Sequence, residues 1–382
     1  MTAIHCHFAL DRVSDTGVRA ILDGLGVDRD NVRALRFEAS TGALLVEVRD
    51  QAAAERVESF VAGMRRTQRL VTRKTLLEHA PCRPEPGVSA AEIAASPDLA
   101  LLGEGLTGLT GNALKLFRYF ERGFADLARA FDAEDHHFPV MLPSTTLAEM
   151  GYFAHFPQHV TFCCHFPDSL PLLERIAAEP HLADRAAAQL SPPEHVLTPG
   201  VCLPCYRLLK GARLGSDEVR TLTMQNHVFR YEAGNFRPLA RGWDFSVRDI
   251  VFFGSGPTLE RLRGEVIQRA FEWCCALDLD VSIELANDPF FLDASRDKTV
   301  YQRMGEVKYE LLFRLDAGEA PLAAASFNLH RGFYSSLYDI GHGDGLAESA
   351  CMGFGIDRWV YGFLRQKGLD PARWPEPVRA AL

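Results

Sequence analysis

A stretch between residues 229 and 249 combines arginine, glutamate and an aromatic residue in a spacing suited to binding a nucleotide. Arg230 and Glu232 stand two apart, so on a β-strand both side chains point to the same face. Arg241 and Phe245 follow a turn-rich loop. An arginine can neutralise a phosphate, a glutamate can accept from an adenine amino group, and a phenyl ring can stack on the purine. The segment therefore predicts a nucleotide-binding hairpin, with an ordinary hairpin carrying a surface salt bridge as the alternative.

A second phosphate-binding candidate lies at residues 353–358, in the sequence GFGIDR. Its glycines permit close approach of the backbone at a strand-to-helix junction, and Arg358 would lie in the first turn of the helix. There its guanidinium can face the β- and γ-phosphates, and the helix N-terminus adds a modest attraction for anions. Gly-x-Gly alone is typical of many buried turns. An FRxE hairpin followed about 120 residues later by this motif is a more specific indication of a triphosphate site.

Two further segments place polar residues at alternate positions. Lys308 and Glu310 lie in KYELLF, and Ser326 and Asn328 lie in ASFNLH. Because alternate residues of a strand share a face, each pair can point into one pocket. For Lys308 and Glu310 the alternative is a salt bridge at a half-buried sheet edge.

The composition is that of an ordinary folded protein. Of the 382 residues, 47% are hydrophobic and 24% are charged, which excludes a disordered chain. No apolar run approaches the roughly 20 residues of a membrane helix and no signal sequence begins the chain, so we expect a cytoplasmic protein without membrane contact. Nine cysteines, an odd number, argue against a disulfide framework.

Charge gives little indication of a nucleic-acid partner. The net charge is −9, whereas a polyanion-binding protein usually shows a basic footprint. Residues 65–74 form a basic stretch, which we interpret as a solvated helix end or linker, with a local binding patch as the alternative.

Periodicity divides the chain into a small domain and a large one. Residues 1–80 predict a small α/β domain, residues 81–110 a linker, and residues 111–382 the larger domain. In the small domain the expected strands span 5–10, 33–38 and 43–48, and the expected helices span 16–25 and 52–64.

The larger domain predicts an α+β fold. It should begin with an amphipathic helix over residues 112–133, followed by a strand over 136–143. One apolar stripe on the helix consists of Phe117, Phe120, Phe124, Leu127 and Phe131. Helices at 259–277 and from Gly353 onwards should flank a mainly antiparallel sheet. Its expected strands are 219–224, 227–232, 243–253, 281–286, 308–313 and 323–329.

These motifs resemble those of class II aminoacyl-tRNA synthetases. The hairpin around Arg230 looks like motif 2, residues 353–358 look like motif 3, and the helix leading to Pro143 is similar to motif 1, which in that family builds the dimer interface. Within the class, the chain is most similar to the zinc-dependent seryl-tRNA synthetases of methanogens and their truncated bacterial relatives, the amino acid:[carrier protein] ligases. The resemblance covers about residues 110–370 and implies a class II catalytic domain and a homodimer. Supporting segments are 150–160, 198–206, 308–313, 325–333 and 348–358.

In that subfamily a zinc ion held by Cys, Glu and Cys binds the amino group of the substrate. Matching the motifs assigns the ligands to Cys202, Asp249 and Cys351. Asp249 departs from the family's glutamate by one methylene, so the metal or the strand must shift, or the site is impaired. Three protein ligands leave the open position that a substrate amine needs. Cys205 is a rival to Cys202, because Cys202-x-x-Cys205 has metal or redox spacing.

The resemblance also implies roles for the polar residues around the phosphates. The ATP-binding residues would be Arg230, Glu232, Arg241, Phe245, Glu348 and Arg358, with Arg230 and Arg358 as the catalytic pair. The substrate-contacting residues would be Lys308, Glu310, Ser326 and Asn328. The magnesium-binding glutamate of the synthetases falls near residue 322, where this chain has Pro-Leu-Ala. Mg²⁺ coordination must therefore differ, using Glu310 or Glu348.

The activity implied is ATP-dependent activation of a small amino acid to an aminoacyl-adenylate, with transfer to the phosphopantetheine thiol of a carrier protein. Charging of tRNA is the first alternative, and it needs an RNA-binding appendage. Residues 1–80 are the candidate, but their 12 Lys/Arg and 11 Asp/Glu show no basic excess. A catalytically silent regulatory module is the second alternative, and the joint presence of the ATP-contacting residues argues against it.

Overall fold

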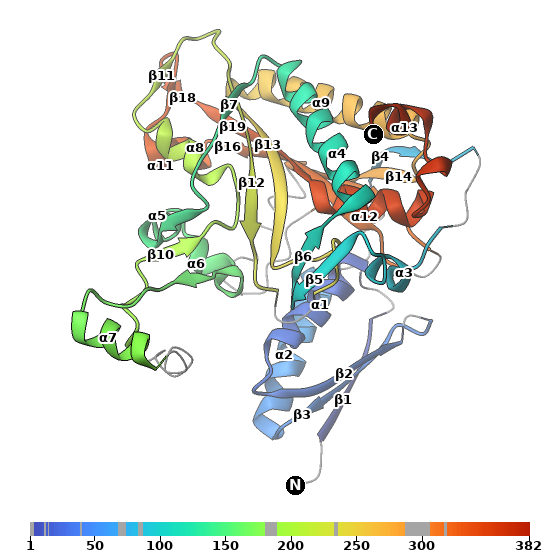
Figure 1. Cartoon of the computed structure of the whole chain (residues 1–382), viewed down its shortest axis with the longest axis vertical. Coiled ribbons are helices and arrows are strands. Elements are labelled where there is room, and N and C mark those ends of the chain that lie inside the picture. Colours follow the sequence, from blue (N-terminus) through green and yellow to red (C-terminus); the bar gives the residue numbers. More distant parts are fainter. Residues whose placement is uncertain are drawn as a thin grey trace.

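The computed structural model describes residues 4–10, 13, 15–38, 40–67, 74–82, 87–179, 189–232, 236–286, 306–316 and 319–382. Its largest element is an eight-stranded sheet in the order β4-β14-β15-β16-β19-β13-β12-β7 (Figure 1). Every neighbouring pair is antiparallel except β12 and β7, so the predicted α+β class is confirmed. The strands span Thr75–His79 (β4), Glu134–His136 (β7), Arg220–Phe229 (β12), Asp244–Gly254 (β13), Val281–Leu285 (β14), Lys308–Phe313 (β15), Leu322–Arg331 (β16) and Glu348–Gly355 (β19).

Three helices cover one face of this sheet: α4 (Gly111–Arg129), α9 (Gly256–Ala276) and α12 (Ile356–Lys367) (Figure 1). The core between them is aromatic, with Phe120, Phe124 and Trp359 fully buried. Gly123 lets α4 approach α9, since a Cβ there would come within 2.2 Å of the Trp273 ring. Of the predicted apolar stripe, Phe120 and Phe124 lie on the core-facing side of α4, and Phe117 and Leu127 are only partly buried. The helix ends at Arg129 and not at residue 133, so Phe131 lies beyond it.

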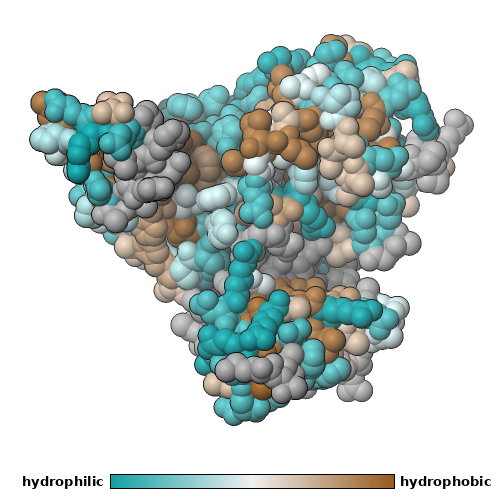
Figure 2. All heavy atoms as spheres, turned by 60° about the horizontal axis from the view of Figure 1, so that its bottom comes forward, coloured by the Kyte–Doolittle hydropathy of each residue, from teal (hydrophilic) through white to brown (hydrophobic). Residues whose placement is uncertain are grey.

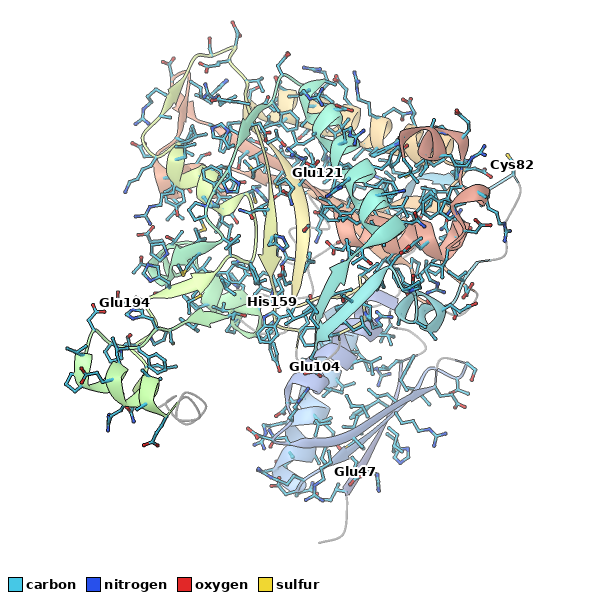
Figure 3. The ribbon with its side chains drawn as sticks, in the orientation of Figure 1. Glu47, Cys82, Glu104, Glu121, His159 and Glu194 are labelled. Atoms are coloured by element: carbon cyan, nitrogen blue, oxygen red, sulfur yellow. The ribbon has the colours of Figure 1, made fainter. Side chains whose placement is uncertain are left out.

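One charged side chain interrupts this aromatic face. Arg248 of β13 is buried and donates to Glu121 of α4 over 2.6 Å and to Asp135 over 3.3 Å. Glu121 is labelled in Figure 3, beside the sheet.

The opposite face of the sheet carries a second hydrophobic cluster, which includes Met224, Val251 and Phe253. The helices that pack there are short: α5 (Ser144–Glu149), α6 (Tyr152–His155), α8 (Leu203–Leu208) and α11 (Phe333–Tyr338). Two small sheets adjoin them, β8-β10-β9 and β11-β17-β18. Their strands are Met141–Pro143 (β8), Phe162–Cys163 (β9), His195–Leu197 (β10), Arg213–Leu214 (β11), Gly341–His342 (β17) and Gly345–Leu346 (β18). The remaining short elements are η1 (Pro157–His159), α7 (Leu170–Ala178), η4 (Pro371–Arg373) and α13 (Glu376–Ala381).

The N-terminal unit has its own three-stranded antiparallel sheet and its own core. The sheet order is β1-β3-β2, and two helices cover it around buried Ile21, Val46 and Val61. Its elements are β1 (Ile4–Ala9), α1 (Asp15–Val27), β2 (Val32–Glu38), β3 (Ala43–Val48) and α2 (Gln51–Thr67), within a few residues of the predicted bounds. Figure 2 turns this unit forward and shows hydrophilic and apolar groups mixed over its surface.

One strand next to the predicted domain boundary joins the large sheet. Residues 75–79, placed in the N-terminal domain from sequence, form β4 at the edge of the large sheet and pair with β14, about 200 residues later. The predicted linker contains structure as well: α3 (Ala90–Ala94), with a capping box between Ser89 and Glu92, and the hairpin of β5 (Leu99–Gly103) and β6 (Leu106–Leu109). Such non-local pairing leaves no periodic signal in the chain.

Two strand predictions are corrected. The expected strands 219–224 and 227–232 are one strand, β12, which ends at Phe229. The expected strand 136–143 divides into β7 and β8, because Pro139 lies between two segments that join different sheets. Most of the basic stretch, residues 68–73, lies outside the described residues, as do residues 233–235 of the predicted hairpin loop. Among the described residues, no helix combines the length and apolarity needed to cross a membrane.

Candidate active site and metal centre

A cavity of about 290 Å³ lies against the sheet face opposite α4, α9 and α12. Val228 of β12 and Ala323, Ala324 and Ala325 of β16 border it. Four strands line the rest with alternate residues, because successive side chains of a strand point to opposite faces. These residues are Phe245, Val247 and Asp249 (β13), Lys308 and Glu310 (β15), Ser326, Asn328 and His330 (β16), and Cys351, Gly353 and Gly355 (β19). The residues between them, such as Ile250, Phe327 and Met352, pack into the helix-covered core.

Three possible metal ligands meet at this cavity. Cys202 precedes α8, Asp249 is in β13 and Cys351 is in β19. One ligand atom from each lies within 4.8 Å of the others, and Asp249 and Cys351 are buried. The rival Cys205, a residue of α8, is fully buried in the second hydrophobic cluster and does not belong to this group.

The electrostatics of the three groups suit a divalent cation. Burial raises the pKa of Asp249 to about 6, although hydrogen bonds with the two thiols lower it. The hydrogen bond with Cys202, followed by burial, raises the pKa of the Cys351 thiol well above its usual value. The bond with Cys351 lowers the pKa of Cys202, but burial and the Asp249 charge outweigh it and the net shift is upward. Such crowded acids ionise readily only when a cation compensates their charge, and two sulfurs with one carboxylate are a donor set that fits zinc.

The shorter aspartate reaches the two sulfurs because its neighbour is a glycine. Asp249 pairs with Gly353 across β13 and β19. A Cβ on Gly353 would lie 2.7 Å from Oδ1 of Asp249, so the carboxylate lies over the space that a side chain would fill.

Arg230 and Arg358 both line the cavity. Nε of Arg230 donates to the Pro199 carbonyl over 2.9 Å, and its guanidinium carbon lies 5.7 Å from the centroid of the Phe245 ring. Arg358, in the first turn of α12, donates to two backbone carbonyls over 2.9 Å each. Burial lowers the pKa of Arg358 to about 10, so it stays charged at neutral pH.

Glu232 and Arg241 form an ion pair beside the cavity, and their side chains are only 16% and 14% exposed. The negative charge of Glu232 raises the pKa of Arg358, and the positive charge of Arg241 lowers it. Both residues therefore lie close to the Arg358 guanidinium. The sequence predicts Glu232 on a strand, but β12 ends three residues earlier, and the ion pair holds the carboxylate instead.

The two polar pairs predicted on alternate strand positions do face the cavity. Lys308 and Glu310 also pair with each other, Nζ to Oε1, over 3.1 Å, so both interpretations of this segment apply at once. Asn328 donates to Oγ of Ser326 over 3.1 Å and to the Cys351 carbonyl over 3.3 Å, which ties β16 to the strand that carries one possible ligand.

The structure does not bring Glu348 to the cavity. It stands three residues from Cys351 on β19, an odd spacing that turns its side chain to the other face. There its carboxylate lies beside Gly256 at the start of α9 and accepts from Arg331 over 3.2 Å. Of the two carboxylates considered for magnesium, Glu310 is the one that lines the cavity.

Sequence reasoning missed His330, Tyr334 and Tyr152, all of which line the cavity. The signal for His330 was present, because it continues the alternation of Ser326 and Asn328 along β16. Nothing in the sequence indicated the two tyrosines, which come from helices on the cavity side.

Comparisons in sequence connect the chain with two groups of ligases. An amino acid--[acyl-carrier-protein] ligase of Bradyrhizobium diazoefficiens is 29% identical over 252 residues, covering 66% of this chain and 75% of the relative. A second such ligase of that bacterium is 27% identical over 255 residues, covering 66% and 78%. A type-2 serine--tRNA ligase of Methanothermobacter thermautotrophicus is 25% identical over 248 residues, covering 63% of this chain and 48% of the relative. No model of a known protein family matches the chain.

Comparisons in structure give the fold. M. kandleri SerRS in complex with A. aeolicus tRNASec matches with a TM-score of 0.69 at 21% identity, over 99% of this chain and 77% of that one. The cytoplasmic serine-tRNA ligase from Naegleria fowleri in complex with AMP matches with a TM-score of 0.62 at 10% identity, over 87% and 72%. The fold is therefore that of class II seryl-tRNA synthetases, and the resemblance recognised from the motifs is confirmed. The first structural match extends over residues 1–80, which the sequence resemblance left out.

Proposed function

We propose that this protein activates a small amino acid with ATP and transfers it to the phosphopantetheine thiol of a carrier protein. The observation that carries the proposal is the cavity that Arg230, Phe245 and Arg358 share with Cys202, Asp249 and Cys351. It combines groups for a triphosphate with groups for a metal-bound amine. The sequence relatives include ligases that join amino acids to acyl-carrier proteins.

In the first step a carboxylate oxygen of the amino acid attacks the α-phosphorus of ATP. The new P–O bond forms as the bond to the bridging oxygen breaks, and pyrophosphate leaves with that electron pair. Arg230 stabilises charge on the α-phosphate, and Arg358 neutralises the β- and γ-phosphates. Phe245 stacks on the purine, and Glu232 accepts from the adenine amino group. Positioning and charge stabilisation supply most of the rate.

Zn²⁺ would be held by Cys202, Asp249 and Cys351, and when bound it offers an open coordination position to a neutral amine. This arrangement selects α-amino acids over hydroxy acids. Mg²⁺ would accompany ATP, with Glu310 as the carboxylate available in the cavity.

In the second step the phosphopantetheine thiolate attacks the carbonyl carbon of the aminoacyl-adenylate. A thioester forms, the acyl–phosphate bond breaks and AMP leaves. No cysteine of this chain is needed as a nucleophile. The two at the cavity have raised pKa values, so without a metal both favour the thiol form, which is a poor nucleophile.

Charging of tRNA is the second candidate function. The match to a tRNA-bound SerRS extends over the N-terminal unit, which favours it. The near balance of 12 Lys/Arg against 11 Asp/Glu in residues 1–80 favours a carrier protein, since RNA binding usually needs a basic excess. A homodimer is part of the proposal: the β5–β6 hairpin, which exposes Leu101 and Leu102, the latter by 75%, immediately precedes α4, the helix that resembles motif 1.

The test is amino-acid-dependent exchange of pyrophosphate into ATP, screened over all amino acids with and without zinc chelation. We expect exchange with one or a few small amino acids and its loss on chelation. Arg230→Ala should lower kcat/KM by about 10²–10³-fold. Arg261→Ala, which removes an exposed arginine of α9, serves as the matched control and should leave it unchanged.

Absence of exchange with every amino acid under every metal condition would contradict the proposal. Transfer of the activated amino acid to a phosphopantetheinylated carrier protein or to tRNA, assayed side by side, separates the two candidate functions.

A further inference from the structure

The register of β16 against β19 orders the cavity residues along one line. Ser326 pairs with Gly353, and Asn328 pairs with Cys351. His330 follows two residues after Asn328, where a β-bulge interrupts the pairing of β16 with β19, and its side chain also lines the cavity. Arg358 lies in the other direction, past the end of β19. The possible metal ligands therefore lie between the arginine end of the cavity and His330.

Three aromatic side chains close the cavity at the His330 end. His330 and Tyr334 line it, and Tyr206, fully buried, lies behind them; we call these three the end wall. Tyr206 and Tyr334 stack with ring centroids 4.0 Å apart, and the imidazole meets the Tyr334 ring edge-on at 5.1 Å.

Tyr206 fixes the orientation of the imidazole. Its hydroxyl lies 2.8 Å from Nδ1 of His330. Burial raises the pKa of Tyr206 well above its usual value, so the hydroxyl stays protonated and can donate a hydrogen bond to Nδ1. Behind Tyr206 the edge-on ring of Phe253 fills the core at 5.5 Å. Tyr206 and Phe253 are both fully buried, so the imidazole of His330 cannot recede in their direction to admit a larger group.

We propose that His330, positioned by Tyr206, limits the size of the amino-acid side chain that the cavity accepts. The inference rests on the proposed function, in which the amine lies at Cys202, Asp249 and Cys351 and the carboxylate points toward Arg230. The side chain on Cα then extends into the part of the cavity that the nucleotide leaves open, which the end wall closes. Side chains of the size found in glycine, alanine and serine fit, and branched ones such as valine meet the imidazole.

The test compares wild type with His330→Ala in pyrophosphate exchange with glycine, alanine, serine and valine. Each excess methylene in a closed pocket costs about tenfold or more in kcat/KM. We expect His330→Ala to raise kcat/KM for valine relative to the best small substrate by at least about tenfold, with the KM for ATP unchanged. Tyr206→Phe, which keeps the ring and removes the hydroxyl, should shift the same ratio by a smaller factor.

Two further variants keep the test decisive. His330→Asn retains a polar group if the alanine variant folds poorly, and Leu337→Ala, on the exposed side of α11, is the control that should leave the ratio unchanged. An unchanged ratio, or an equal loss for all four amino acids, would overturn the proposal and give His330 a structural role.

A second readout separates this inference from the proposed function. Binding of the same four amino acids to the zinc-loaded protein, measured by calorimetry without ATP, reports selectivity independently of adenylate formation. Selective binding that His330→Ala relaxes, with no exchange in wild type, would support the end wall and contradict the ligase. Exchange in wild type, with the same selectivity in His330→Ala in both assays, would support the ligase and contradict the role of the end wall. Absence of both binding and exchange would overturn both proposals.

Discussion

The two faces of the large sheet consist of alternate residues of the same strands, yet they differ in kind. The helix-covered face packs Phe124, Phe354 and Trp359 into a dry aromatic core. The cavity face carries Asp249 and Cys351, buried acids that are costly to ionise, and the buried ion pair of Lys308 with Glu310. The comparison teaches that each strand contributes one set of alternate residues to the packed core and the other set to the cavity. A well-packed face can offset the unfavourable burial of ionisable groups on the other.

Removing a core ring tests the helix-covered face with the largest expected effect on stability. Phe124 is fully buried against Phe354, Trp273 and Trp359, so Phe124→Ala should lower the free energy of unfolding by about 3–5 kcal/mol. Exchange activity per folded molecule should stay close to that of wild type. Urea unfolding with active-site titration measures both quantities. A large change in the KM for ATP with little loss of stability would contradict the assignment of stability to the helix-covered face and of chemistry to the cavity face.

The pH dependence of stability sharpens the comparison at the edge of the helix-covered face. Asp357 accepts from the Ser246 backbone amide over 2.7 Å, and burial raises its pKa to about 6, with His227 lowering it and Asp244 raising it. Its ordinary pKa is 3.8, so between about pH 4 and 6 the native state binds more protons than the unfolded state. The Asp357 contribution to the free energy of unfolding should therefore fall across this range as pH rises, by up to about 3 kcal/mol. Asp249, whose pKa burial also raises to about 6, contributes a slope of the same sign. Asp357→Asn should therefore make the fall in the urea-derived free energy of unfolding between pH 4 and 6 less steep, and an unchanged slope would contradict this assignment.

A matched pair of glycine substitutions should separate the two faces. A Cβ on Gly362 of α12 would lie 2.5 Å from the buried Phe313 ring, so Gly362→Ala should cost about 1–3 kcal/mol of stability. A Cβ on Gly353 would lie 2.7 Å from Oδ1 of Asp249, the end of a side chain that can move, and at an ordinary contact distance of 3.5 Å from Oγ of Ser326. Gly353→Ala should therefore leave the melting temperature nearly unchanged while weakening zinc binding and exchange about tenfold. Equal effects of the two substitutions on melting would show that the cavity face also carries the fold.

The smallest effect is expected at Glu348, which resembles an ATP-binding position in sequence but faces away from the cavity. Glu348→Gln should change exchange kinetics by less than about twofold. It should cost at most about 1 kcal/mol of stability through the half-exposed pair with Arg331. A tenfold rise in the KM for ATP would return this residue to the nucleotide site.

Local patterns predicted most of the elements that line the cavity. β15 begins and ends at the predicted residues, because KYELLF alternates cleanly between the two faces. β12 was divided in two because the polar pair Gln225-Asn226 interrupts its apolar pattern, although both residues pair with β13. Where the side-chain pattern lapses, backbone pairing still continues the strand, and only the partner strand reveals it.

The site was predictable where its residues belong to one strand. Alternation alone brought Lys308 to the same face as Glu310, and Ser326 to the same face as Asn328. Glu348 was assigned to the nucleotide site because its odd spacing from Cys351 along β19 was not considered. His330 was overlooked, although it lies at an even spacing from Ser326 and Asn328. The gathering of Asp249 with Cys351 depends on the register between β13 and β19, and Cys202 joins them from the start of α8. No local pattern encodes this arrangement, and only the family resemblance assigned the three residues to one site.

The edge strand β4 has a consequence for how this protein can be divided. Although it follows the N-terminal unit in the chain, it covers the outer edge of β14 through pairs such as Val281 with His79. A shortened chain beginning at residue 81 would leave the N–H and C=O groups of β14 open to pairing with other molecules, which invites aggregation. A chimera that takes its N-terminal unit from a relative should therefore be joined upstream of residue 74, so that β4 still covers the edge of the sheet.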